Sequence, residues 1–384
     1  MIVKGGKTIT PYGFFKNQDI KVESQKITEL GNLDNAGDQT QEIFDVSGLY
    51  VSPGFIDIHS HGGIGYNLMC DNEQDILNAV RECGKFGVTS VMPTIDGNEN
   101  LTEEVIRQYQ AYNDAMKHNE TGTQILGVHV EGPYFPASQN PRRIDIIPDL
   151  ENVAKLIELA PCIKRVTTAP EVEHGLELID LLVKNGIAVS VGHCEASFDK
   201  VAEAYSRGAR QVTHFFTGMK GVYREETGDR KPGLIETAQI LDFVIEVIAN
   251  GRHVSPELLN MVYRVKGADK VCIVTDSHYL PEEESPGDNA HWSKYVCKAD
   301  FGDGKLHLNS FMPMPIMVKV MVKEAGVSLI DAVRMATLTP AETMKVDDVK
   351  GKLLPGYDAD IVAFDDDFNI KLVIARGTVV KNAL

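Results

Sequence analysis

The chain has 384 residues, and 43% of them are hydrophobic, which excludes a disordered polypeptide and allows a large core. Its 38 Lys and Arg against 55 Asp and Glu give a net charge of −17, which argues against nucleic acid or an anionic membrane as a partner. We see neither a signal-peptide pattern nor an apolar run near the ~18 residues that cross a bilayer. The six cysteines form no C-x-x-C pair, so we expect a cytoplasmic protein with reduced thiols.

Short β segments at both ends of the chain predict a small domain built from residues 1–53 and 350–384. Near the start they include "MIVKGG", "DIKVES" and "EIFDVSG", and near the end "IKLVIARGTVVKN". Gly, Asn and Asp punctuate these runs, and neither end carries a long helical pattern. We therefore expect the two chain ends to pair in a small β-sandwich domain.

The middle of the chain, residues 54–349, alternates β-type runs with amphipathic helical stretches. Eight β runs lie at 55–60, 88–94, 125–132, 164–171, 188–193, 211–216, 243–251 and 271–277. Stretches such as "NEQDILNAVRECGKFG" and "TEEVIRQYQAYNDAMK" separate them. Apolar strands that alternate with helices indicate a parallel sheet that is buried on both faces. Eight such units predict an α/β fold, a (β/α)8 TIM barrel.

Two histidines end the first of these runs, in "FIDIHSHGG" at 55–63. Alternate side chains of a strand point the same way, so His59 and His61 should aim at one point. The glycines that follow should let the loop bend tightly beside them. We expect the two imidazoles to bind a divalent metal.

Further residues with ligand chemistry end most of the other runs. They are Glu131 after the third, His193 after the fifth, His214 in the sixth, His253 beyond the seventh and Asp276 in the eighth. One histidine at a strand end is usually a hydrogen-bonded structural residue. Such residues at the same end of six runs instead predict a metal site, because active sites of these barrels lie at the carboxyl ends of the strands. Imidazoles with carboxylates favour Zn, Fe, Mn or Co over Ca or Mg.

In their order along the chain, these motifs resemble the amidohydrolase superfamily and, within it, the N-acetylglucosamine-6-phosphate deacetylase family. The resemblance covers nearly the whole chain and rests on "VSPGFIDIHSHGG", "HVEGPYF", "VSVGHCEAS", "VTHFFTGM", "RKPG", "VIANGRHVSPELL" and "IVTDS". It implies a cytoplasmic, homodimeric, metal-dependent hydrolase that converts N-acetylglucosamine 6-phosphate to glucosamine 6-phosphate and acetate.

The resemblance also implies a role for each candidate residue. Glu131, His193 and His214 would hold one metal ion, and His59 and His61 match members that hold a second, so one or two ions are expected, foremost Zn. Asp276 is a further candidate ligand. Asp276 would also move the proton. His253 and Arg230 would contact the substrate, with Arg230 supplied by the other subunit.

Three departures from the family pattern leave the exact sugar open, and one of them is "NSFMPMP" after the eighth run, where the family has a stretch of small residues. Thr217-Gly218, which would contact the sugar phosphate, stands where the family usually has Asn-Ala. Gln139 falls where some members place a histidine that polarises the scissile carbonyl. Its amide can donate a hydrogen bond but not a proton. Apart from these departures, the fourth run ends "TTAPE", without the lysine that many other superfamily members use as a ligand. The resemblance gives that role to Glu131, as in the deacetylases.

Three alternatives follow. The nearest keeps the reaction and changes the substrate to N-acetylgalactosamine 6-phosphate or another N-acyl amino sugar. A cyclic-amide or dipeptide hydrolase is less consistent with the missing lysine. A barrel without metal, kept as an interaction scaffold, is inconsistent with intact ligands at every expected position.

Overall fold

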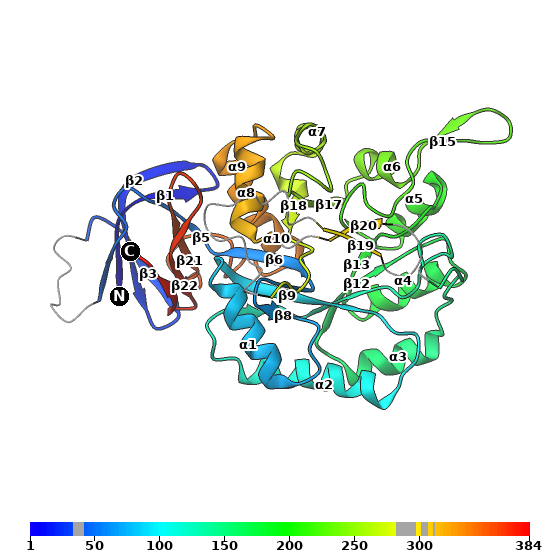
Figure 1. Ribbon diagram of the computed structural model, residues 1–384, viewed down its shortest axis with the longest axis horizontal. Helices are drawn as coiled ribbons and strands as arrows, with labels where there is room; N and C mark the ends of the chain where they lie inside the picture. The colour runs from blue at the N-terminus through cyan, green and yellow to red at the C-terminus, as the bar shows by residue number, and fades with distance from the viewer. Residues whose placement is uncertain (34–41, 141, 282–296, 301–305, 310–311) are drawn as a thin grey trace.

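The computed structural model describes residues 1–33, 42–140, 142–281, 297–300, 306–309 and 312–384. Figure 1 shows a helix-covered barrel beside a smaller all-β region, at the left, that holds both termini. Within the described residues, no helix combines the length and the apolar character needed to cross a membrane.

Parallel strands form the barrel, and each lies at one of the predicted runs. They are β6 (Phe55–Ser60), β9 (Val88–Asp96), β11 (Val128–Glu131), β12 (Ile163–Thr168), β13 (Ala188–Val191), β14 (Gln211–Val212), β17 (Val244–Ile248) and β18 (Val271–Val274). Neighbours in this order pair in parallel. The ring closes where the Asp276 N–H donates to the His59 carbonyl oxygen at 2.9 Å. The predicted barrel is confirmed.

Helices between and after the strands cover the outside of the barrel (Figure 1). They are α1 (Glu73–Gly84), α2 (Glu103–His118), α3 (Leu150–Leu159), α4 (Gly175–Lys184), α5 (Phe198–Ser206), α6 (Leu234–Ile240), α7 (Pro256–Lys266), α8 (Met314–Lys323), α9 (Leu329–Met335) and α10 (Leu338–Thr343). Side chains of Asn72, Thr102 and Ser197 accept backbone N–H groups of the first turns of α1, α2 and α5. These caps start the helices because the first N–H groups of a helix lack partners within it.

The two chain ends build one sheet of eight strands. It comprises β1 (Ile2–Thr10), β2 (Gly13–Glu23), β3 (Lys26–Gly31), β4 (Ile43–Asp45), β5 (Tyr50–Pro53), β21 (Ile361–Phe364), β22 (Ile370–Ala375) and β23 (Thr378–Asn382). Antiparallel pairing of β5 with β21 joins the two ends. One core takes Val3 and Ile20 from the first end and Ile361 and Leu372 from the second, so the sheet curls around it. The predicted pairing of the ends is confirmed, while the domain boundaries after 53 and before 350 stay predictions.

Short elements complete the described chain. They are β7 (Gly62–Gly63), β8 (Tyr66–Asn67), β10 (Gln124–Ile125), β15 (Tyr223–Arg224), β16 (Arg230–Lys231), η1 (Ala268–Lys270), β19 (Cys297–Asp300) and β20 (Leu306–Asn309). The β15–β16 hairpin projects away from the barrel at the upper right of Figure 1.

Candidate metal centre

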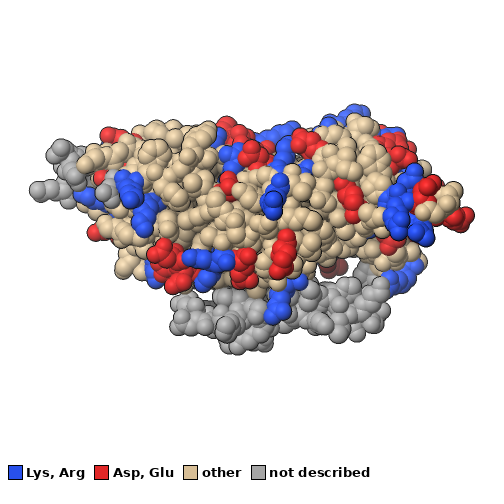
Figure 2. Space-filling model, turned by 90° about the horizontal axis from the view of Figure 1, so that it is seen from above, with Lys and Arg blue, Asp and Glu red and all other residues tan. Residues whose placement is uncertain are grey.

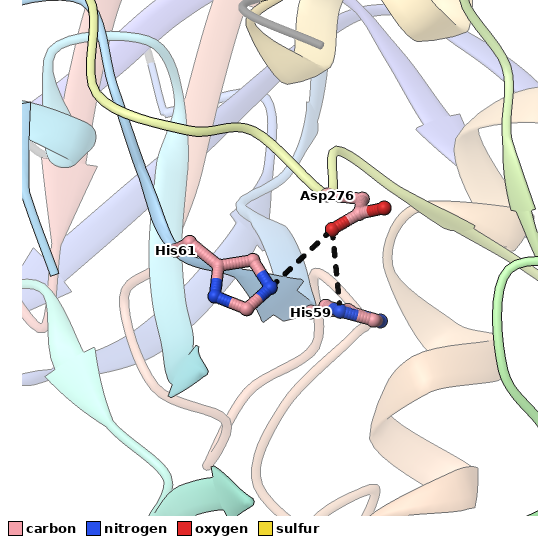
Figure 3. Close-up of side chains that lie close together, drawn as sticks. All are labelled: His59, His61 and Asp276. Carbon is pink, nitrogen blue, oxygen red and sulfur yellow. Dashed lines mark ion pairs between the residues drawn. The ribbon is translucent and has the colours of Figure 1, made fainter. Parts of the chain in front are cut away.

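His59 and His61 converge at the end of β6, on the side of the barrel where Asp276 follows β18 (Figure 3). Nε2 of His59 lies 3.3 Å from Asp276 Oδ1, and Nε2 of His61 lies 3.5 Å from the same oxygen. The imidazoles are buried, with 0% and 2% of their side chains exposed, whereas Asp276 keeps 16%. The alternation of side chains along a strand thus brings both rings to one carboxylate.

A second group forms beside the first, from the ends of β11, β13 and β14. Glu131 Oε1 lies 3.1 Å from His193 Nε2 and 2.9 Å from His214 Nε2, and the two histidine nitrogens are 2.9 Å apart. The other Glu131 oxygen, Oε2, lies 3.2 Å from His61 Nε2 and 3.4 Å from His59 Nε2. Glu131 therefore stands between the two groups.

The residues present suit a divalent ion. Each group offers imidazole nitrogens and a carboxylate oxygen whose atoms lie within 4.8 Å of one another. Ligand bonds of ~2.0–2.2 Å around a tetrahedral ion separate ligand atoms by roughly 3.4 Å, close to the spacing found here. Nε2 of His59 is buried and has no hydrogen-bond partner within the described residues. A metal ion bound to this nitrogen would supply the missing partner.

Charges in the site compensate one another across the two groups. Burial acts to lower the pKa of His59, but the carboxylates of Asp276 and Glu131 outweigh it and raise this pKa well above its usual value. Burial acts to raise the pKa of Glu131, but His59 and the other imidazoles outweigh it and hold this pKa well below its usual value. The carboxylates therefore favour positive charge among these imidazoles, which a divalent ion would supply on binding to the neutral rings.

The backbone is unusual at three of these residues. His193, His214 and Asp276 have φ angles of 47°, 26° and 43°. Side chains other than glycine seldom adopt this left-handed region, and such strain gathers at functional sites. The left-handed backbone at His193 and His214 also ends their strands earlier than predicted. β13 ends at Val191 rather than at 193, and β14 ends at Val212 rather than at 216.

Glycines after His61 are required by close packing. A Cβ atom added to Gly62 would lie 2.8 Å from the Tyr66 carbonyl oxygen, and one added to Gly63 would lie 2.4 Å from the Tyr66 ring. The β7–β8 hairpin therefore folds back on itself beside the site only because both positions lack a side chain.

Several residues near the ligands were missed by the sequence patterns. Asp96 ends β9 and forms a third potential ligand group with His61 and Glu131. The ring of His278 stacks on that of His61, with centroids 4.6 Å apart and planes 7° from parallel. Asp96 stands two residues beyond the predicted run at 88–94, and His278 stands one residue beyond the run at 271–277. Extending the two runs by these residues would have found both.

Two further residues were missed for a different reason. Arg165 and Glu246 are charged, fully buried and located within strands β12 and β17 rather than at their ends. Glu246 interrupts the apolar run at 243–251, and that interruption is a sequence signal that could have identified it. Arg165 follows Lys164 at the start of its run, where a charged residue is unremarkable.

On the substrate side, the structure places Gln139 and Gly218 beside His193. A Cβ atom added to Gly218 would lie 2.9 Å from His193 Nδ1 and 3.3 Å from Gln139 Oε1. Gln139 Nε2 donates to Glu195 Oε1 at 3.2 Å. Thr217 adjoins this group, and its N–H donates to the His214 carbonyl oxygen at 3.0 Å.

The other two substrate residues lie on different kinds of segment. His253 follows β17 in a loop, where its Nδ1 lies 2.8 Å from Asn250 Nδ2. Arg230 is exposed on β16 of the projecting hairpin (Figure 1).

Relatives of known function match almost the full length of the chain. N-acetylglucosamine-6-phosphate deacetylase of Lysinibacillus sphaericus is 27% identical over 389 residues, covering 99% of this chain and 97% of that protein. N-acetylgalactosamine-6-phosphate deacetylase of Escherichia coli O157:H7 is 28% identical over 336 residues, covering 85% of this chain and 86% of that protein. The crystal structure of N-acetylglucosamine-6-phosphate deacetylase from Thermotoga maritima is 28% identical, covers 100% of both chains and superposes with a TM-score of 0.81.

A model of the amidohydrolase family matches residues 50–380. This range spans the barrel and the part of the small sheet that comes from the C-terminal end of the chain. This match confirms the resemblance that the motifs indicated, and membership implies a divalent metal for which the two ligand groups are candidates. The chain belongs to the amidohydrolase family.

Proposed function

We propose that this protein is a metal-dependent hydrolase that removes the acetyl group from N-acetylglucosamine 6-phosphate and releases glucosamine 6-phosphate and acetate. The observation that carries the proposal is the Glu131 carboxylate between two histidine pairs, with distances of 2.9–3.4 Å to their nitrogens. Full-length relatives with this activity in their names support the substrate.

We assign the ligands in two groups. Glu131, His193 and His214 would hold the first ion, and His59, His61 and Asp276 the second. Zinc suits imidazole and carboxylate ligands with open positions, and Fe, Mn or Co are the alternatives. A bound divalent ion would lower the pKa of a water molecule and polarise the acetyl carbonyl.

Asp276 would carry the proton. Burial acts to raise its pKa, but His59 and the other imidazoles outweigh this effect and the Glu131 repulsion, so that its pKa lies below the usual value. The carboxylate is therefore ionised at neutral pH and can accept a proton from the attacking water. It would then donate this proton to the leaving amine nitrogen, acting first as general base and next as general acid.

Gln139 would steady the carbonyl oxygen as negative charge develops there. A glutamine amide carries two N–H groups, and the hydrogen bond to Glu195 occupies one of them. The second remains for the substrate. Oε1 of Gln139 faces Gly218 and His193, so the role would require the amide to turn and present Nε2 to the substrate.

Arg230 and His253 would bind the phosphate, with Arg230 contributed by the second subunit of a homodimer. Figure 2 shows acidic and basic side chains interspersed over one face, with basic ones gathered at the end of the molecule where the β15–β16 hairpin projects. Arg224, Arg230 and Lys231 of this hairpin are exposed, so a neighbouring copy could receive them. The planar guanidinium of arginine suits phosphate because it can bind two oxygens at once.

The second candidate substrate is N-acetylgalactosamine 6-phosphate. The Escherichia coli O157:H7 relative of that name supports it, since its identity of 28% equals that of the Thermotoga maritima enzyme. Thr217-Gly218 also alters the pocket that would contact the sugar phosphate. In either case a cytoplasmic location is consistent with the described cysteines, which are free.

The test is a comparison of kcat/KM for both N-acetylated sugars, each with and without the 6-phosphate. We expect N-acetylglucosamine 6-phosphate to be the best substrate and its unphosphorylated form to be poor. Preference for the galacto epimer would change the assignment to the second candidate. Equal turnover of the phosphorylated and unphosphorylated sugars would refute a sugar-phosphate substrate and leave a metal-dependent deacylase.

A further inference from the structure

A buried ion pair lies inside the barrel, beneath the metal ligands. Arg165 on β12 and Glu246 on β17 are 0% and 1% exposed, and Arg165 Nη1 lies 2.5 Å from Glu246 Oε1. Burying two charges costs more solvation than their attraction usually returns, so apolar side chains of the same volume would stabilise the barrel as well or better. The pair therefore calls for a reason other than packing.

The second oxygen of Glu246 contacts both ligand groups. Oε2 lies 3.1 Å from Nδ1 of His59 and accepts the backbone N–H of His214 at 3.2 Å. The first contact holds the side chain of His59, and the second holds the main chain of His214. His59 thus depends on Glu246 for its orientation, whereas the His214 backbone is also tied to Thr217 at 3.0 Å.

This contact decides which nitrogen of His59 faces the ligand groups. An ionised carboxylate can only accept, so Nδ1 must carry a hydrogen to bond with it. Nε2 is then left to give its lone pair to a metal ion. It points at the ligands, 3.3 Å from Asp276 Oδ1 and 3.4 Å from Glu131 Oε2. A carboxylate that orients a ligating histidine in this way typically changes metal affinity ~10–100-fold.

Arg165 holds the carboxylate in place. Besides Glu246, its guanidinium donates from Nε to Gln211 Oε1 at 2.6 Å and from Nη1 to the Ile58 carbonyl oxygen at 3.2 Å. Ile58 precedes His59 on β6. The guanidinium therefore connects the strand that carries His59 with the strand that carries its carboxylate partner.

We propose that Glu246, held by Arg165, is a positioning residue that orients His59 and thereby sets the affinity of the ion bound by His59, His61 and Asp276. The inference rests on the metal centre of the proposed function but not on its sugar substrate.

Cobalt titration of the metal-free protein tests it, with visible absorption reporting the geometry of each ion and elemental analysis the number bound. Two variants are needed. Glu246→Gln keeps the shape and one acceptor, and Arg165→Met/Glu246→Leu replaces both charges by apolar side chains. Because the double variant leaves no buried unpaired charge, its melting temperature should stay near that of the wild type.

We expect the double variant to bind the second ion ~10–100-fold more weakly and Glu246→Gln to lie between it and the wild type, with the first ion little changed. The matched control is Ser190→Ala. Ser190 is equally buried on β13, and its hydroxyl bonds Thr213 Oγ1 at 2.6 Å rather than a ligand side chain, so both ions should bind as in the wild type.

Three results would overturn the inference: wild-type affinity for both ions in the double variant, equal weakening of both ions, or uptake of a single ion by the wild type that His59→Ala leaves unchanged. Wild-type protein that binds two ions but does not hydrolyse N-acetylglucosamine 6-phosphate would refute the proposed substrate and leave this inference standing.

Discussion

The proposed metal ligands and the proposed substrate residues are close in sequence but are held in different ways. His214 and Thr217 are three residues apart, as their numbers show. His59, His61, Glu131 and His214 extend from the ends of hydrogen-bonded strands and are at most 11% exposed in their side chains. Gln139, His253 and Arg230 instead lie on loops or on the projecting hairpin. In the proposed function the barrel would thus hold the reaction chemistry, while segments that can change without disturbing it would hold the sugar.

Loss of the metal should have the largest effect on activity, because it would remove the ion that the residues at the strand ends are proposed to bind. Chelation is expected to reduce hydrolysis to background, and Zn, Mn, Co or Fe to restore it. Glu131→Gln should also lose the tightly bound ion, because Glu131 stands between both ligand groups. Elemental analysis with activity measurements checks both, with exposed Glu173→Gln as the control. Full activity in metal-free protein would refute the metal mechanism.

Asp276→Asn should come next. The amide keeps the shape of the side chain but cannot accept a proton, and general acid–base groups contribute typically ~10²–10⁴-fold. We expect kcat to fall by at least that order while most of the bound metal is retained. Steady-state kinetics and metal analysis of the same preparation measure this. Near wild-type turnover would show that another residue is the base.

Arg230→Ala should have a smaller effect that depends on the substrate. A hydrogen bond to a charged group is worth roughly 1.5–3 kcal/mol, so kcat/KM should fall roughly 10–150-fold on the 6-phosphorylated sugar. The unphosphorylated sugar should lose little. Equal losses on both sugars would remove Arg230 from the phosphate site.

Mixing Arg230→Ala with Asp276→Asn tests the origin of the arginine. If Arg230 reaches the partner's site, heterodimers contain one site with both lesions and one with neither. Activity should then exceed that of either parent. Activity that only averages the two parents would place Arg230 in its own subunit's site.

The smallest effect concerns stability on the substrate side. Glu171 Oε1 accepts the N–H of Glu195 at 2.6 Å, and burial raises the pKa of Glu171 to about 7. A carboxyl whose pKa is raised on folding contributes stability that is fully present below its usual pKa and is lost as the pH rises through 7. We compare the free energy of unfolding of Glu171→Gln with that of the wild type. This difference should be about 1–3 kcal/mol more favourable to the variant at pH 8 than at pH 5. Denaturant unfolding at both pH values measures this, with Glu173→Gln as the exposed control, and a pH-independent difference would contradict it.

Much of the fold, and the convergence of the candidate ligands, followed from the sequence because local rules govern both. Alternating strand and helix patterns located all eight barrel strands, whose carboxyl ends must share one face. The period of two along β6 was enough to predict that His59 and His61 converge. The order of the motifs was enough to predict the family.

Only the tertiary structure brought Arg165, Glu246 and His278 to the ligands. Arg165 and Glu246 come from β12 and β17, which are not neighbours in the barrel, and meet only because the sheet closes on itself. His278 stacks on His61 because β18 closes the ring beside β6. No local period encodes these contacts, since they depend on side chains that cross the interior from distant strands. Sequence thus determined which residues stand at the strand ends, and closure of the barrel decided what lies beneath and beside them.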